Sequence, residues 1–369
     1  MNILLIGGTG TLSTAVRNFA IIEGHQVSLF NRGNHNTNIP REVKIIIGDF
    51  KNKASLEANF IDSKYDVVID FLSRKSNDIE RVYPIFKNRC QQYIFISSAC
   101  VYRREKKDFP IKESSPKPNT DWSYNIEKYE CEETLIKLSK NASSYYTIIR
   151  PYITYDENRI PFGIAPEYQY HRTIIERIRA GKPMFVWDDG KALTTVTHVE
   201  DFAKAIVGLF LNNKAKNEDF HITGDFHYTG RELIEKIYHS LDVKPNIISV
   251  PSEKIATMMP QYASMLKGDR SLDALFDNSK IKNAVPGLIF QIDIYEGMKR
   301  IIRNYDSKPE RYYDYAYEGQ VDKMLKNIGV ETQFVNYQGS DRYQKVKYYI
   351  YKYAPYKYAN RLCRILKVN

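Results

Sequence analysis

The feature that most constrains this chain is a glycine-rich segment directly after a short apolar run near the N-terminus. Residues 3–6 read Ile-Leu-Leu-Ile, and residues 7–10 read Gly-Gly-Thr-Gly. The run is typical of a buried parallel strand, and a helix is expected at residues 14–23. Glycines at such a junction let backbone N–H groups approach a pyrophosphate, and the helix N-terminus adds partial positive charge. The pattern predicts dinucleotide binding at Gly7, Gly10, Thr11 and Leu12, and a plain glycine turn is the alternative.

The rest of the first half alternates apolar and helical segments. Strands are expected at residues 27–30, 43–47, 66–70, 93–97, 146–150 and, late in the chain, 220–222. Helices are expected at residues 79–87 and 124–139. This alternation predicts an α/β fold with a Rossmann-type, doubly wound parallel sheet.

The strand and helix pattern loosens after Arg150-Pro151. We expect residues 1–155 and about 191–240 to form the dinucleotide-binding domain. A smaller substrate domain is expected from residues 156–190 and 241–305. Residues 306–369 are then a C-terminal extension, with a helix near residues 320–327.

Composition and cysteine spacing bear on the cellular compartment of the protein and on metal binding. No apolar run in the 369 residues approaches the ~18 residues of a membrane-spanning helix. Residues 2–6 are too short for the apolar core of a signal peptide. The four cysteines have neither disulfide-like nor metal-like spacing. These features predict a cytoplasmic protein without a metal site.

The segments after the second, third and fourth strands predict how the cofactor is held. An acidic residue after the second strand would bind the ribose 2′-hydroxyl of NAD, but this chain has Asn31 and Arg32. Arg32 favours the 2′-phosphate of NADP, with NAD and a solvated Arg32 as the alternatives. Asp49 and Phe50 are placed to flank the adenine, unless they form a simple strand-end turn, and Phe71 is expected beside the cofactor.

Tyr124 and Lys128 lie four residues apart in an expected helix, so they share one face. A nearby ammonium favours the phenolate and lowers the pKa of a tyrosine toward a useful range. Ser98 follows the strand at 93–97, at the edge where doubly wound sheets bind ligands. Its hydroxyl can bond a reacting C–OH or C=O group, while capping of a loop or helix is the alternative.

These motifs, with Val101-Tyr102, Arg150-Pro151 and residues 198–201 (His-Val-Glu-Asp), resemble the extended and atypical short-chain dehydrogenase/reductases of the NAD-dependent epimerase/dehydratase family. The resemblance implies that Ser98, Tyr124 and Lys128 form the catalytic set. It also implies that the backbone around Pro151 and Ile153 holds the nicotinamide carboxamide. A small domain closing over the substrate, and a homodimer formed through helices near 79–88 and 124–139, are implied as well.

Two departures from the family pattern bear on the substrate. Sugar dehydratases of this family carry an Asp-Glu pair where this chain has Ala99 and Cys100, so dehydration is disfavoured. The epimerases usually place a diphosphate-binding arginine at the position of Thr194. Lys191, Lys267 and Arg270 are the candidates to replace it, unless they are ordinary solvated charges.

The C-terminal segment carries most of the excess charge. Residues 340–369 hold eight basic residues and one acidic residue, so they contribute +7 of the net charge of +10. Seven tyrosines lie between these basic residues. The segment can pack on its own domain or a second subunit, dock on a protein or on the inner face of an anionic membrane, or bind single-stranded nucleic acid. Nucleic acid is the least favoured of these.

The sequence thus predicts an NAD(P)-dependent epimerase or keto-sugar reductase acting on a sugar, most simply a nucleotide-linked one. The alternative is a non-catalytic protein on the same scaffold that binds RNA or senses the cofactor, because the atypical relatives include plastid RNA-binding proteins.

Overall fold

The computed structural model describes residues 1–34 and 39–366, and these form two compact units. Unit 1 comprises Met1–Thr154, Thr195–Phe226 and Ala274–Ile292. Unit 2 comprises Tyr155–Thr194, His227–Asp273 and the chain from Asp293 on.

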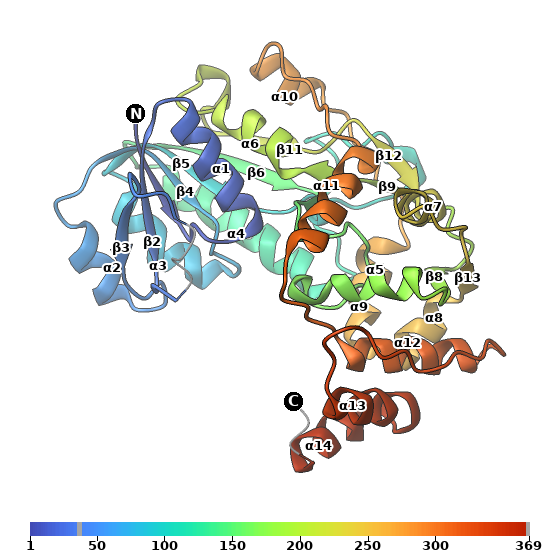
Figure 1. Ribbon diagram of the computed structural model, residues 1–369. Coiled ribbons are helices and arrows are strands. Elements are labelled where there is room, and N and C mark those ends of the chain that lie inside the picture. Colours follow the sequence, from blue (N-terminus) through green and yellow to red (C-terminus); the bar gives the residue numbers. More distant parts are fainter. Residues whose placement is uncertain (35–38, 367–369) are drawn as a thin grey trace. The chain divides into compact units, whose positions relative to one another are not determined.

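Unit 1 is built on a seven-stranded sheet in the order β11-β6-β5-β4-β1-β2-β3, and every neighbouring pair is parallel (Figure 1). Its strands are β1 (Asn2–Ile6), β2 (Gln26–Asn31), β3 (Lys44–Ile47), β4 (Tyr65–Asp70), β5 (Cys90–Ile96), β6 (Tyr145–Pro151) and β11 (Glu218–Ile222). The predicted doubly wound α/β fold is confirmed, including the late seventh strand. Because Ile6 lies opposite Asp70, and Asp70 opposite Phe95, the carboxyl ends of β1, β4 and β5 form one edge.

Alternating side chains along the strands build two cores, one on each face of the sheet. Ile3 and Leu5 pack with α1 (Thr11–Ile22) and α6 (Val199–Val207). Leu4 and Ile6 pack on the other face, in the core that receives α2 (Lys53–Phe60), α3 (Ser76–Phe86) and α4 (Ser123–Ser139). The unit is therefore a three-layer α/β/α sandwich, as Figure 1 shows.

Unit 2 is mainly helical and contains a two-stranded parallel sheet. Its strands and helices are β8 (Met184–Trp187), β13 (Ile247–Val250), α5 (Arg172–Arg179), α7 (Gly230–Ser240), α8 (Ser252–Met258), α9 (Ala263–Met265), α11 (Ile294–Ser307), α12 (Tyr315–Lys326), α13 (Arg342–Tyr353) and α14 (Tyr356–Ile365). The short strands β7 (Thr154–Tyr155), β9 (Leu193–Thr195), β10 (Thr197–His198) and β12 (His227–Thr229) lie near the sequence boundaries of the units. None of the helices in the described ranges combines the length and hydropathy of a transmembrane segment.

The two units divide the chain differently from the expected domains. Helix α7, expected with the first domain, belongs to unit 2 and packs on α11. Residues 274–292, expected with the substrate domain, belong to unit 1. They include α10 (Ser279–Ala284), and their Ile281 and Phe290 enter the same core as α6.

Candidate active site

The glycine segment forms the turn between β1 and α1. Gly7 has φ +83°, a left-handed conformation that favours glycine, and its N–H donates to the Phe30 carbonyl oxygen at 2.9 Å. Gly10 is the N-terminal cap of α1, and its N–H donates to Ser13 Oγ at 3.0 Å. A Cβ added at Gly10 would meet only Ser13 Oγ, at 3.6 Å, among the described atoms. The backbone at the positive end of α1 is therefore open to a phosphate group, and the predicted residues Thr11 and Leu12 begin the helix there.

The residues expected around the adenosine occupy the ends of the next strands. Asn31 ends β2, and its side-chain oxygen accepts from the Gly33 N–H at 2.7 Å, while Arg32 is exposed. Asp49 is exposed beyond β3, with its carboxylate accepting from the Lys51 N–H at 2.9 Å. Arg32 follows β2 and Asp49 follows β3, so both side chains are open to solvent at the same edge of the sheet.

Phe50 and Phe71 are less open than the sequence suggests. Phe50 is 9% exposed, packs in the core beneath α2 and α3, and carries the Arg81 guanidinium over its ring at 5.1 Å. Phe71 directly follows β4 and is partly buried against the core on the α1 and α6 face.

Helix α4 presents Tyr124 and Lys128 one turn apart. Tyr124 is partly exposed, and its ring centroid lies 4.8 Å from that of Trp122, the residue that caps the helix. Lys128 is 5% exposed, and its ammonium donates to the carbonyl oxygens of Ser73 at 2.7 Å and Ile96 at 2.9 Å. Ser73 follows β4 and Ile96 is the last residue of β5, so the ammonium is anchored at the carboxyl ends of these strands.

The buried position of Lys128 changes its acidity. Desolvation lowers the pKa of Lys128 to about 8. The side chain of Asp70, near this lysine, is also buried and accepts from the hydroxyl groups of Tyr93 at 2.8 Å and Ser73 at 2.5 Å. A buried lysine with a lowered pKa is a common feature of functional sites.

Ser98 lies two residues beyond β5, at the same edge, and is 6% exposed. Its Oγ accepts from the Cys100 N–H at 3.2 Å and caps the short 3-10 helix Ala99–Val101. The capping role expected as the alternative is therefore present. Its hydroxyl proton is not used by this bond and can be donated to a substrate oxygen.

Sequence reasoning missed a buried carboxylate one turn beyond Lys128. Glu132 binds the Arg150 guanidinium through two bonds, Nε to Oε1 at 2.9 Å and Nη2 to Oε2 at 2.7 Å. Ser97 Oγ donates to the same Oε1 at 2.5 Å. The signal available in the sequence was that Glu132 follows Lys128 by four residues and therefore lies on the same face of the helix. The pair ties α4 to the ends of β5 and β6, and so fixes the height of Tyr124 and Lys128 over the sheet.

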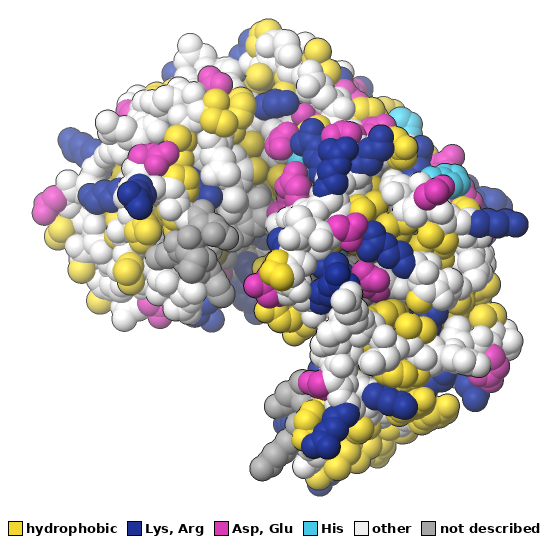
Figure 2. All heavy atoms as spheres, in the orientation of Figure 1, with side chains coloured by type: hydrophobic (Ala, Val, Ile, Leu, Met, Phe, Trp, Pro, Cys, Tyr) yellow, Lys and Arg dark blue, Asp and Glu magenta, His cyan; other side chains and the backbone are white. Residues whose placement is uncertain are grey.

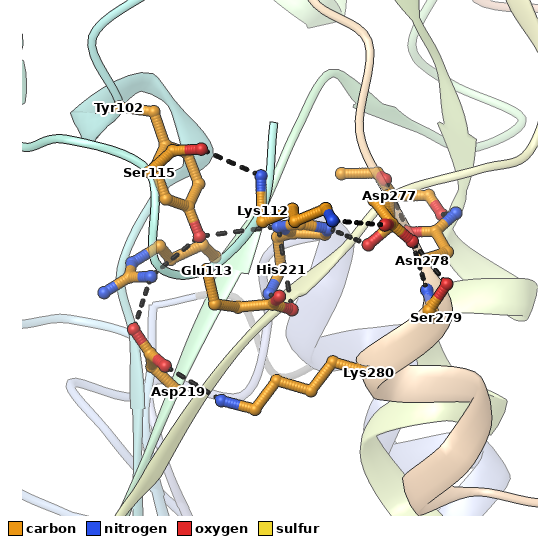
Figure 3. Close-up of polar contacts among 12 residues, drawn as sticks. Tyr102, Lys112, Glu113, Ser115, Asp219, His221, Asp277, Asn278, Ser279 and Lys280 are labelled. Carbon is orange, nitrogen blue, oxygen red and sulfur yellow. Dashed lines mark hydrogen bonds and ion pairs between the residues drawn. The ribbon is translucent and has the colours of Figure 1, made fainter. Parts of the chain in front are cut away.

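Arg150 extends this network toward β11. Its Nη1 donates to the Tyr102 hydroxyl at 2.7 Å and pairs with Asp219 at 2.6 Å. His221 Nε2 lies 2.8 Å from the Asp277 carbonyl oxygen, and burial lowers the pKa of His221 to about 4. Figure 3 shows the Tyr102 hydroxyl directed toward His221 and the Asp219 carboxylate directed toward Lys280.

The segment after β6 has an unusual backbone. Pro151 is the last residue of β6, and Ile153 has φ +31°, which is uncommon for a β-branched residue. His198 is 1% exposed and caps α6 by accepting from the Glu200 N–H at 3.3 Å.

Lys267 and Arg270 belong to unit 2 and lie in the π-helical segment Leu266–Arg270. The Arg270 guanidinium pairs with the adjacent Asp269. The backbone carbonyl oxygen of Arg270 accepts from Trp187 Nε1 at 2.7 Å. Both residues have protein interactions in this structure. Their role toward a diphosphate stays a prediction.

Comparison with known proteins shows what this chain is similar to. The model of the NAD dependent epimerase/dehydratase family matches residues 84–223. A chloroplast stem-loop binding protein of 41 kDa from Arabidopsis thaliana is 29% identical over 240 residues, which cover 62% of this chain and 60% of that protein. The 2'-dehydrokanamycin reductase of Streptomyces kanamyceticus is 22% identical over 288 residues, covering 78% of this chain and 79% of that protein.

The fold is shared with solved epimerases. The UDP-glucose 4-epimerase of Bifidobacterium longum, solved in complex with NAD+ and UDP, has a TM-score of 0.65 and 19% sequence identity. The match covers 85% of this chain and 100% of that one. With its parallel sheet, its glycine turn and the family model matched over residues 84–223, the chain is similar to the NAD-dependent epimerase/dehydratase family.

Proposed function

We propose that this protein is an NAD(P)-dependent epimerase or keto-sugar reductase that acts at a carbinol carbon of a nucleotide-linked sugar. One observation carries the proposal: Lys128 is buried one helical turn from Tyr124 and donates to carbonyl oxygens at the carboxyl ends of β4 and β5. The ammonium of lowered pKa therefore lies at the sheet edge that also bears the glycine turn, and Tyr124 shares its helix face one turn away.

The residues divide the work as follows. Backbone N–H groups of residues 7–12, other than those of Gly7 and Gly10 themselves, bind the pyrophosphate at the N-terminus of α1. Pro151 and Ile153 offer backbone groups to the carboxamide. Tyr124 takes the proton from the sugar hydroxyl at its phenolic oxygen, and the positive charge of Lys128 stabilises the phenolate. Ser98 donates its hydroxyl proton to the sugar oxygen. When bound, the nicotinamide supplies the hydride acceptor or donor.

The epimerase and the reductase differ in what they consume. An epimerase returns the hydride to the sugar and needs no net cofactor, whereas a reductase consumes one reduced nicotinamide per product. Similarity to the reductase from Streptomyces kanamyceticus supports a reductase activity, and similarity to the epimerase from Bifidobacterium longum supports an epimerase activity. We further propose that Arg32 makes NADP the preferred cofactor and that Lys267 and Arg270 bind the diphosphate.

The decisive experiment removes only the phenolic oxygen. Tyr124→Phe is expected to lower kcat on the wild-type substrate by at least ~100-fold, because general acid–base catalysis is lost. The dissociation constant for NADP should stay within about threefold, since the phenol makes none of the phosphate contacts. Tyr129→Phe, on the same helix and also partly exposed, is the matched control and should keep its activity.

A second candidate function is a non-catalytic binding protein, favoured by the similarity to the chloroplast stem-loop binding protein. It predicts that Tyr124→Phe leaves the function intact and that stem-loop RNA binds in a salt-dependent manner. Full activity of Tyr124→Phe, or failure of the wild type to bind either nicotinamide cofactor, would rule out the enzyme.

Assembly and location complete the proposal. A homodimer formed through α3 and α4 in the cytoplasm is the arrangement we propose, because the family resemblance implies it. Sedimentation velocity at micromolar concentration measures the oligomeric state directly. A protein that sediments as a monomer at all concentrations would contradict it.

A further inference from the structure

The C-terminal helices α12 and α13 are fastened to unit 2 by a buried cluster of charges. Arg177 Nη1 contacts Glu318 Oε1 at 3.0 Å and Asp322 Oδ1 at 2.8 Å. Lys182 Nζ reaches Glu318 Oε2 and Asp322 Oδ2, each at 2.6 Å. All four side chains are at most 5% exposed. Separating these charges would leave them unpaired away from water, so α12 is fixed against α5.

The inner faces of α13 and α14 are committed to this packing. The Tyr348 hydroxyl donates to Asp322 Oδ2 at 2.6 Å, and Lys352 Nζ donates to the Thr332 carbonyl oxygen at 2.7 Å. Tyr351 packs with Ala359 and Cys363 of α14 in a separate apolar cluster. Neither helix can therefore turn its other face inward without breaking buried contacts.

The outer faces of the same helices expose apolar side chains at helical spacing. On α13 these are Tyr343 (49% exposed), Val346 (42%), Tyr349 (39%) and Tyr353 (61%). On α14 they are Tyr358 (52%), Leu362 (38%), Ile365 (65%) and Leu366 (53%). We call these eight residues the outer stripe. Each helix is thus apolar on two faces, one buried and one open to solvent.

Positive charge accompanies the outer stripe. From residue 342 to the C-terminus the chain contains no acidic residue and eight basic ones: Arg342, Lys345, Lys347, Lys352, Lys357, Arg361, Arg364 and Lys367, the last outside the described residues. Lys357, Arg361 and Arg364 are exposed on α14 among the outer stripe. Figure 2 shows hydrophobic and basic side chains adjoining on the part of α13 and α14 that faces the viewer.

We propose that the outer stripe is a docking surface for an anionic phospholipid membrane. Tyrosines with short aliphatic side chains suit the headgroup level of a bilayer, and the surrounding lysines and arginines attract anionic headgroups. Two signals together, apolar burial and charge, are what stable peripheral binding requires. The positive charge would also attract a nucleic acid, but binding a nucleic acid does not require the exposed aliphatic side chains of Leu362, Ile365 and Leu366. The absence of acidic residues from this segment leaves the charge unopposed.

The test uses the full chain and co-sedimentation with vesicles. The wild type is expected to bind vesicles of phosphatidylcholine mixed with phosphatidylserine, more weakly as salt rises, and not vesicles of phosphatidylcholine alone. Lys357→Glu/Arg361→Glu/Arg364→Glu should weaken binding at least about a hundredfold, because each basic residue near the surface contributes roughly a fivefold gain. Ile365→Asp/Leu366→Asp should weaken it about tenfold through lost apolar burial.

A matched control separates this surface from general basicity. Lys106→Glu/Lys137→Glu/Lys140→Glu makes the same change in charge at three exposed lysines of unit 1 and should bind vesicles like the wild type. Equal loss in the control, or no binding by the wild type, would overturn the proposal. It would also be overturned if the Ile365→Asp/Leu366→Asp variant kept full vesicle binding while losing self-association or binding to single-stranded RNA. Because vesicle binding needs no turnover, the result is independent of the proposed enzyme activity.

Discussion

Glu132 and Arg150 form a two-bond ion pair in which each side chain is only 2% exposed. One belongs to the helix that carries Tyr124 and Lys128, and the other to the end of β6. The pair therefore connects the proposed catalytic helix to the sheet edge. Its loss would affect both the stability of unit 1 and the position of the phenol.

Replacement of Glu132 is expected to destabilise the protein strongly. Glu132→Ala leaves the Arg150 guanidinium with fewer buried partners, which typically costs about 3–5 kcal/mol of unfolding free energy. Chemical denaturation measures this cost. Glu133→Ala, at the exposed neighbouring position on α4, should change the stability by less than about 0.5 kcal/mol. Equal stability of the two variants would show that the pair contributes little.

The charge at position 32 is expected to set the choice of cofactor. Arg32→Asp should weaken NADP binding at least about tenfold and leave NAD binding unchanged or stronger, because an acidic side chain repels a 2′-phosphate and can bond a 2′-hydroxyl. Titration of nicotinamide fluorescence with the reduced cofactors measures both affinities. Arg41→Asp, at another exposed arginine of unit 1, serves as control. An unchanged ratio of the two affinities would remove Arg32 from the cofactor site.

The buried charge cluster of unit 2 is expected to hold the C-terminal helices in place. Asp322→Ala removes a partner of Arg177, Lys182 and Tyr348 together, and should cost about 3–5 kcal/mol in the stability of unit 2. Limited proteolysis should then cut the chain between α12 and α14 faster than in the wild type. Glu331→Ala breaks the exposed pair with Lys326 and should cost less than about 1 kcal/mol. Identical cleavage of all three proteins would contradict this anchoring.

The neutral, buried His221 is expected to weaken the protein in acid. Burial lowers its pKa to about 4, below the value near 6.5 of the unfolded chain. Between these values the unfolded state binds the additional proton, so the free energy of unfolding falls as the pH drops from about 6.5 to 4. At pH 5 the loss amounts to about 2 kcal/mol.

Comparison with a residue that does not titrate isolates this effect. His221→Gln is less stable than the wild type at pH 7, because packing and the bond to the Asp277 carbonyl are altered, but it should lose less stability between pH 7 and pH 5. Urea unfolding at the two pH values gives the difference. His239→Gln, at an exposed position, should retain the pH dependence of the wild type. A variant at position 221 with the wild-type slope would show that another group causes the loss.

Local patterns in the sequence predicted the sheet correctly because a parallel strand buried on both faces leaves a continuous apolar run. The run at Ile3–Ile6 followed by glycines, and the spacing of Tyr124 and Lys128, also marked one edge of the sheet in advance. Catalytic and cofactor roles for these residues stay predictions, although the structure brings Lys128 to the ends of β4 and β5. The roles of Glu132 and of Asp322 were not foreseen, because their partners are distant in sequence.

Short-range spacing by itself determined the fold class, the glycine turn, the shared helical face of Tyr124 and Lys128, and the basic character of the C-terminal segment. Only the tertiary structure decided that Arg150 meets Glu132, that α7 joins unit 2, and which face of α13 and α14 is buried. Local preferences act over one or two turns of chain, whereas Glu132 and Arg150 are 18 residues apart, and Lys182 and Glu318 of the buried charge cluster are 136 residues apart. Their pairing depends on how the elements pack, which no single segment of the sequence encodes.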